Sequence, residues 1–250
     1  MQPRKILVMA IARSGHHVVM NWLCNQLPGR VVFMNNCNQE LKYRNRKVHN
    51  NGGGGKTIMH SFENFDLNGF KEYNFAEYFT DVIIINRDPY NLIASSIAKG
   101  TKLSVLTETI ANSRNKFIYD KWWCASLPRY DMIFQYLEQC LGEKDYLGVD
   151  CYDINYNKWF VDIDYRKKII DDFGGDFTDQ GMQHVPMRGV GSSFDRLAYK
   201  GRGNEMDVLN RWKNLTDNKR YMSLVSDPRI AYFSEKYFNF NPLSDREVNQ

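Results

Sequence analysis

Residues 5–12 (KILVMAIA), followed by Arg13-Ser14-Gly15-His16-His17, decide the fold class of this chain. A nearly continuous apolar run of this length is typical of a strand that is covered on both faces of a parallel sheet. After the turn, apolar residues recur at spacings of three and four along residues 18–27, and Pro28-Gly29 follows them. This spacing predicts a helix that ends before the proline. The segment therefore predicts a strand, a tight turn and a helix.

Further β-rich runs predict the other strands of a sheet. They are residues 30–34 (RVVFM), 56–60 (KTIMH), 81–86 (DVIIIN) and 146–150 (YLGVD). Helical spacing occurs between them: residues 103–141 predict two or three helices, one of them at 130–141, and residues 164–173 predict another that ends at Gly174-Gly175. Strands alternating with helices are typical of the α/β class. We therefore expect residues 1–250 to form a single α/β domain with a central parallel β-sheet flanked by helices.

Composition limits the class of function. The 250 residues are 43% hydrophobic and 25% charged, which is enough apolar sequence for a large core. A formal charge of +4 is too small for the extended basic surface of a dedicated nucleic-acid-binding protein. Residues 188–220 carry eight basic and four acidic side chains, so positive charge is concentrated there. We expect a local anionic ligand and no nucleic-acid partner.

Cysteine spacing and hydropathy indicate the compartment. The five cysteines are widely spaced and form no C-x-x-C pair, which argues against a disulfide scaffold or a structural zinc site. The apolar run at residues 6–12 follows Arg4 and Lys5, but it is short for a signal peptide. No stretch approaches the ~20 apolar residues of a membrane span. We expect a soluble, cytoplasmic protein.

The turn Arg13-Ser14-Gly15 is the first candidate site. A helix N-terminus has unpaired N–H groups and the positive end of the helix dipole, so it favours an anion. Gly15 allows close approach of the backbone, Ser14 adds a hydroxyl donor, and Arg13 adds a forked cation suited to phosphate or sulfate. The alternative is an ordinary strand-to-helix turn with a solvated arginine.

The second candidate site follows residues 81–86, where Arg87-Asp88-Pro89 leads into a predicted helix. Pro89 suits the first turn of a helix. Arg87 leaves at the carboxyl end of its strand, where open α/β sheets bind ligands, and Ser95 lies about two helical turns further on. Both side chains would reach one phosphate if the strand end and the helix pack side by side. The alternative is a helix cap with an Arg–Asp pair at the surface.

Together, these two motifs resemble the sulfotransferases that use 3′-phosphoadenylyl sulfate (PAPS), whose fold is similar to that of P-loop NTPases. In that family, a Lys/Arg-Ser-Gly-Thr-Thr loop binds the 5′-phosphosulfate. A later Arg-Asp-Pro segment, with a serine eight residues after the arginine, binds the 3′-phosphate. The resemblance implies the first role for Arg13, Ser14 and Gly15 and the second for Arg87 and Ser95. Residues 150–154 and the helix after them are a further likeness to the family.

The chain departs from the family pattern at several positions. His16 and His17 stand where the family has two hydroxyl residues, so imidazole donors would replace those hydroxyls at the cofactor. Val18 stands where an aromatic residue often follows, which leaves the adenine-stacking residue unassigned. Residues 199–203 are an approximate counterpart of the late Arg-Lys-Gly loop, which implies cofactor contacts for Arg202 and Gly203. Residues 191–193 (GSS) are a further candidate lining of this part of the site.

The resemblance also implies a catalytic base. In cytosolic members a histidine at a strand end lies twenty to thirty residues before the 3′-phosphate arginine, and His60 precedes Arg87 by 27. An imidazole titrates near neutrality and can accept a hydroxyl proton. Glu63 is the competing candidate, because other branches of the family use a glutamate. In a purely structural interpretation, His60 is a hydrogen-bonded residue at a strand end.

The sequence therefore predicts a PAPS-dependent sulfotransferase. It would move the sulfuryl group to an acceptor hydroxyl or amine, on a carbohydrate or small molecule, and release adenosine 3′,5′-bisphosphate. Arg13 and the N–H groups of Ser14, Gly15 and His16 would neutralise charge on the leaving phosphate. This chemistry needs no metal. The alternatives are a nucleotide-dependent kinase on a related fold and a noncatalytic nucleotide- or glycan-binding protein.

We expect residues 35–55 to form a long surface loop. Two sequence features in or next to this segment suggest other ligand-binding sites. The segment 52–57 (GGGGKT) ends like a Walker A motif, but Asn50 occupies the position of that motif's first glycine. The basic run at residues 42–47 is typical of a solvated loop, with polyanion binding as the alternative. The oligomeric state and the acceptor are not indicated by the sequence.

Overall fold

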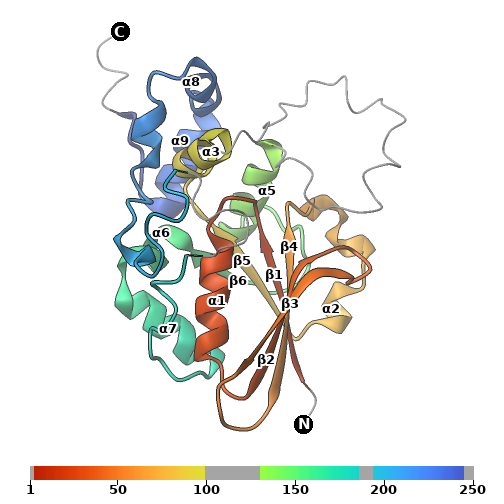
Figure 1. Cartoon of the computed structure of the whole chain (residues 1–250). Coiled ribbons are helices and arrows are strands. Elements are labelled where there is room, and N and C mark those ends of the chain that lie inside the picture. Colours follow the sequence, from red (N-terminus) through yellow and green to blue (C-terminus); the bar gives the residue numbers. More distant parts are fainter. Residues whose placement is uncertain (1–2, 99–129, 186–193, 245–250) are drawn as a thin grey trace.

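A six-stranded sheet forms the centre of the computed structural model, which describes residues 3–98, 130–185 and 194–244 (Figure 1). The strands are β1 (Arg4–Ala10), β2 (Arg30–Cys37), β3 (Tyr43–Asn50), β4 (Lys56–Glu63), β5 (Asp81–Asn86) and β6 (Tyr152–Asn155). Their order is β3-β2-β4-β1-β5-β6, and every neighbouring pair is parallel except β2 and β3. The predicted α/β class with a central parallel sheet is confirmed.

Helices lie on both faces of the sheet (Figure 1). The α-helices are α1 (His16–Gln26), α2 (Phe75–Tyr78), α3 (Pro89–Ala98), α5 (Tyr130–Cys140), α6 (Tyr156–Val161), α7 (Ile163–Phe173), α8 (Lys219–Val225) and α9 (Pro228–Phe238). The 3₁₀ helices are η1 (Leu67–Glu72), η2 (Gly203–Glu205) and η3 (Arg211–Leu215). Helices α1, α6 and α7 cover one face, whereas η1, α2, α5, α8 and α9 pack with the other. In the described parts of the chain, no helix has the length and apolar character needed to cross a membrane.

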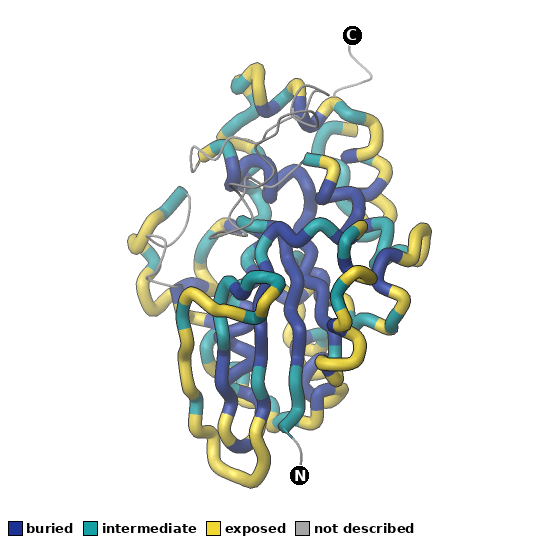
Figure 2. Tube along the Cα trace, turned by 90° about the vertical axis from the view of Figure 1, so that its right-hand side faces the viewer, coloured by how far each residue is buried: buried dark blue, intermediate teal, exposed yellow. Residues whose placement is uncertain are grey.

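Strand β1 divides two hydrophobic cores. Ile6 and Val8 pack with Trp22 and other residues of the α1 side, whereas Leu7 and Met9 belong to the core on the opposite face. All four residues are fully buried, and the strands at the centre of the sheet are mostly coloured as buried in Figure 2. Complete burial of such a side chain stabilises the fold by about 1.5–3 kcal/mol. The continuous apolar sequence of this strand is therefore explained by burial on both faces of the sheet.

The prediction of a long loop at residues 35–55 is wrong. Strand β2 continues to Cys37, and β3 returns antiparallel to it, with Arg30 opposite Asn50 and Val32 opposite Val48. The polar sequence of β3 has no apolar alternation, because this strand lies at the sheet edge and is largely exposed. Charged residues on an edge strand oppose pairing with another chain. The basic run therefore belongs to an edge strand, and the glycines form the turn into β4.

The strand predicted at residues 146–150 is also misplaced. Gly148 has a φ of 67°, which interrupts an extended run, and β6 begins only at Tyr152, opposite Ile83 of β5. Tyr146 and Leu147 owe their apolar character to packing in the core. The helices expected at 130–141 and 164–173 are confirmed as α5 and α7, and Gly174 ends α7 in the left-handed conformation. The helices predicted between residues 103 and 129 lie outside the described residues.

Candidate anion-binding site

Four neighbouring parallel strands end at the same edge of the sheet. Glu63 is the last residue of β4 and lies in register with Ala10 of β1, and Asn86 of β5 lies in register with Asn155 of β6. The loop from β1 to α1 and the segment from β5 to α3 therefore both begin at this edge. Open α/β sheets bind ligands outside the carboxyl ends of their strands.

The turn before α1 has an unusual backbone. Gly15 has a φ of 85°, and a Cβ at this position would overlap the ring of Tyr156, so the turn accepts only glycine. Arg13 has a φ of 75°, a region that costs a non-glycine residue roughly 1–3 kcal/mol. Such conformations persist where the surroundings enforce them, and they cluster at functional sites.

Only part of the expected set of loop donors is available. The Ser14 N–H, which was expected to face the ligand, donates to the Ile11 carbonyl at 3.1 Å in this structure. The Ser14 hydroxyl is buried and lies 3.4 Å from His16 Nδ1. The N–H groups of Gly15 and His16 remain as candidate anion donors at the start of α1.

Arg13 is a half-buried cation in this turn. Burial lowers the pKa of its guanidinium, and the positive charge of Arg211 acts in the same direction, whereas the Glu63 carboxylate raises it. An arginine starts from a pKa so high that it keeps its charge at neutral pH. Arg13 is thus a desolvated cation, and a desolvated cation attracts an anion more strongly than a solvated one does.

Arg87 and Ser95, predicted to meet at one phosphate, are in direct contact. Arg87 Nη1 donates to Ser95 Oγ at 3.0 Å and to the Arg13 carbonyl at 3.3 Å, and Nη2 donates to the Val208 carbonyl. The side chain is buried, and burial lowers its pKa to about 10. Its guanidinium also lies 5.3 Å from the centre of the Tyr156 ring. Arg87 therefore links the two candidate motifs.

The remainder of the Arg-Asp-Pro motif is structural. Asp88 is fully buried, and its Oδ1 accepts the Asn91 N–H at 2.8 Å, as an N-cap residue does in the first turn of α3. Pro89 is the first residue of that helix. The helix-cap interpretation thus applies to Asp88, whereas Arg87 is buried and does not form a surface pair.

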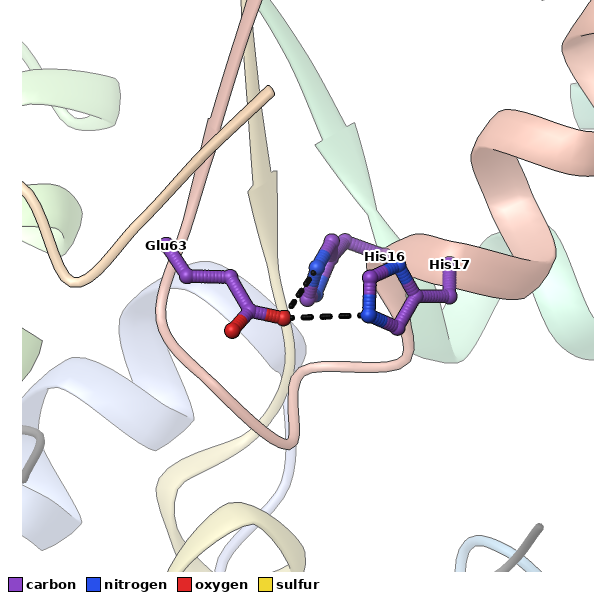
Figure 3. Close-up of side chains that lie close together, drawn as sticks. All are labelled: His16, His17 and Glu63. Atoms are coloured by element: carbon purple, nitrogen blue, oxygen red, sulfur yellow. Dashed lines mark ion pairs between the residues drawn. The ribbon is translucent and has the colours of Figure 1, made fainter. Parts of the chain in front are cut away.

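His16, His17 and Glu63 form a cluster beside this turn (Figure 3). Glu63 Oε1 lies 2.8 Å from His16 Nε2 and 3.1 Å from His17 Nε2. Burial acts to raise the pKa of Glu63, but the two imidazoles outweigh it and hold the pKa well below its usual range. The carboxylate is therefore ionised. The two histidines, expected to contact the cofactor, are directed at Glu63.

His60 lies apart from this cluster. Its alternation along β4 places it on the same face as Phe62, opposite the α1 side that holds Met59. The buried ring packs edge-to-face on Phe79, with centroids 5.2 Å apart. Burial lowers the pKa of His60 to about 4, and the charge of Lys5 adds to the effect. The structure brings Glu63 to the turn before α1 and does not bring His60 there.

In the late basic segment, Arg202 and Arg211 lie in different environments. Arg202 is exposed and pairs with Glu205 at 3.0 Å, and the Gly203 N–H donates to the Gln183 carbonyl. Arg211 is buried, forms an ion pair with Asp195 at 3.2 Å, and acts electrostatically on both Arg13 and Arg87. The excess of positive charge at 188–220 was the signal for such a residue. Residues 191–193 lie outside the described parts of the chain.

Comparisons with known proteins find little at the level of sequence. No family model matches the chain, and no curated protein matches it. Among solved structures, it is similar to the crystal structure of the mouse sulfotransferase SULT7A1 complexed with PAP. The two chains are 15% identical with a TM-score of 0.47, over 100% of this chain and 90% of the mouse chain.

Proposed function

We propose that this protein is a sulfotransferase that moves the sulfuryl group of PAPS to a hydroxyl or amine of a carbohydrate or small molecule. The supporting observation is that one side chain, Arg87, donates both to Ser95 and to the carbonyl of Arg13. The two candidate anion sites are therefore neighbours. PAPS and its product, adenosine 3′,5′-bisphosphate, carry anionic groups on two positions of one ribose, which requires two such sites side by side.

In this proposal, the turn before α1 holds the 5′-phosphosulfate. Arg13 and the N–H groups of Gly15 and His16 are donors at the positive end of α1. Charge grows on the bridging phosphate oxygen as the S–O bond breaks. Fixed donors aimed at that oxygen stabilise the transition state more than the ground state, and this difference accelerates the transfer.

The 3′-phosphate is assigned to Arg87 and Ser95. In the described structure, Arg87 donates to two carbonyl groups of the protein. A phosphate would replace these neutral acceptors with charged ones, and charge-assisted hydrogen bonds are roughly twice as strong as neutral ones. Arg211 adds positive potential at the same place. This second site would give PAPS a higher binding affinity than nucleotides that lack a 3′-phosphate, such as ADP.

We assign the role of proton acceptor to Glu63 in preference to His60. Glu63 lies at the strand end beside the turn and is ionised, whereas His60 is packed among aromatic rings on the opposite face. The acceptor oxygen or nitrogen would attack sulfur in line with the departing phosphate, and its proton would pass to the carboxylate. Because a carboxylate of low pKa is a weak base, we expect its share of the rate to be at the low end of general-base effects.

Isothermal titration calorimetry with adenosine 3′,5′-bisphosphate and with ADP tests the proposal. We expect the bisphosphate to bind more tightly by about tenfold or more, because only this ligand uses the contacts of Arg87 and Ser95. Transfer of labelled sulfate from PAPS to a panel of phenols, sugars and amines then tests the chemistry. Equal binding of the two nucleotides would contradict the assignment of the second site. Tight bisphosphate binding without any transfer would support a noncatalytic binding protein.

A further inference from the structure

We propose that His16, His17 and Glu63 form a binding site for one divalent transition-metal ion of the zinc class. The site is built from the first two residues of α1 and the last residue of β4 (Figure 3). The inference rests on the positions of these three side chains. It does not depend on the binding of PAPS.

The donor atoms have nearly the separations that a metal requires. Four-coordinate zinc has bonds of about 2.0–2.1 Å to imidazole nitrogen and carboxylate oxygen, which places tetrahedral ligand atoms about 3.3 Å apart. Glu63 Oε1 lies 2.8 Å from His16 Nε2 and 3.1 Å from His17 Nε2, and the three donor atoms all lie within 4.8 Å of one another. Small side-chain rotations would bring the three donor atoms to the separations that a metal requires.

His16 is oriented for this role. Its Nε2 is buried and lies 2.8 Å from Glu63 Oε1. Its other ring nitrogen, Nδ1, lies 3.4 Å from the Ser14 hydroxyl. When an outer group holds one ring nitrogen in this way, the other nitrogen presents its lone pair to a metal. The contact with Ser14 thus helps to orient the His16 ring.

The types of donor select the metal. Two imidazoles and one carboxylate are the protein ligands of several catalytic zinc sites, which keep a fourth position for water or substrate. The same donors also bind other first-row divalent ions, with affinities that follow the Irving–Williams order. Calcium and magnesium require oxygen donors and are poorly served by two nitrogens. We therefore expect Zn²⁺ and Co²⁺ to bind and Mg²⁺ not to compete.

The site is open on one side. The side chains of His16 and Glu63 are 3% and 14% exposed, whereas that of His17 is 36% exposed. An ion would enter past His17 and would keep an exchangeable ligand there. Arg13 is close enough to act electrostatically on His16 and Glu63, so its charge opposes the binding of a cation. If the proposed function holds, a bound metal would occupy the Glu63 carboxylate and inhibit sulfuryl transfer.

Titration with Co²⁺ of full-length protein treated with chelator tests the site directly. We expect one Co²⁺ per chain, visible d–d absorption of a low-coordinate site, and displacement of Co²⁺ by Zn²⁺ but not by Mg²⁺. His17→Ala and Glu63→Gln should each weaken binding by at least about tenfold. Arg13→Gln should tighten it, because the repelling charge is removed. His49→Ala is the matched control, since His49 lies on β3 beside Asn25, and it should bind Co²⁺ like the wild type.

Three outcomes would overturn the proposal: no Co²⁺ binding to the wild type, binding that both substitutions leave unchanged, or binding lost in His49→Ala. Circular dichroism and thermal melting check that the variants are folded. His17 is partly exposed, so His17→Ala decides the matter even if Glu63→Gln fails to fold. No nucleotide is present in these titrations. Their failure is therefore distinct from a failure of the proposed sulfotransferase activity.

Discussion

Two titratable side chains of strand β4, those of Glu63 and His60, lie in different environments, although they are only three positions apart in the sequence. Glu63 is the last residue of the strand and contacts the histidines at the start of α1. His60 faces the other side of the sheet and packs on Phe79. Side chains alternate between the faces of a strand, so an odd separation places two residues on opposite faces. Proximity in sequence to an expected site therefore says little about a strand residue until its face is known.

The largest effect is expected from Arg13, on the Glu63 side of the sheet. Arg13→Ala should lower the rate of sulfuryl transfer by about 10²–10³, the usual cost of removing one donor to a developing oxyanion. The melting temperature should change little, because the side chain acts mainly on charge that grows in the transition state. Steady-state kinetics and thermal melting measure the two quantities. A large loss of stability with normal specific activity of the folded protein would assign Arg13 a structural role.

Separate substitutions of Glu63 and His60 test whether the two faces of β4 differ in function. Glu63→Gln should reduce the transfer rate by about 10²-fold, the lower end of general-base effects. His60→Gln should leave the rate of the folded enzyme nearly unchanged, because the ring does not reach the turn before α1. The two variants are to be compared in the same transfer assay at neutral pH. A rate loss in His60→Gln alone would restore the histidine as the base.

Arg87 tests the second anion site on the same edge of the sheet. Arg87→Ala should weaken the binding of adenosine 3′,5′-bisphosphate by about tenfold to a hundredfold, because a charge-assisted contact is lost. ADP should bind both proteins almost equally. Arg202→Ala is the matched control: this exposed arginine pairs with Glu205, and its removal should leave both affinities unchanged. Calorimetric affinities of equal size for wild type and Arg87→Ala would show that the second motif is structural.

The smallest effect concerns stability on the core side of β4. The unfolded chain binds a proton at His60 with a pKa near 6.5, whereas the folded chain does so only near a pKa of about 4. Protons therefore favour unfolding between these values, and the stability from the neutral ring is complete above pH 6.5 and is lost as the pH falls. Linkage gives about 2 kcal/mol between pH 7 and pH 5.

Urea unfolding of the wild type and of His60→Gln at several pH values measures this contribution. The variant should lose less stability than the wild type on acidification, because it has no imidazole at this position. Identical pH dependence of the two proteins would mean that His60 titrates normally in the folded state.

The central strands β1 and β5 were predictable because their sequences are almost continuously apolar. The first strand, the helix after it, α5 and α7 follow from local periodicity, and the capping by Gly174 follows from its conformational freedom. The hairpin of β2 and β3 was missed because an exposed edge strand carries no hydrophobic alternation. The prediction of a strand at residues 146–150 was wrong, because Tyr146 and Leu147 are apolar residues that pack in the hydrophobic core without belonging to the sheet.

The sequence by itself determined the turn Arg13-Ser14-Gly15 between a strand and a helix, and the spacing that lets Arg87 meet Ser95, because these features depend on local geometry. Only the tertiary structure decided which distant residues join them. Arg211 acts electrostatically on Arg13 and Arg87, whereas Arg202 is exposed and pairs with Glu205. Glu63 meets His16 and His17 because β4 and β1 are parallel neighbours in register, which follows from the order of strands in the sheet.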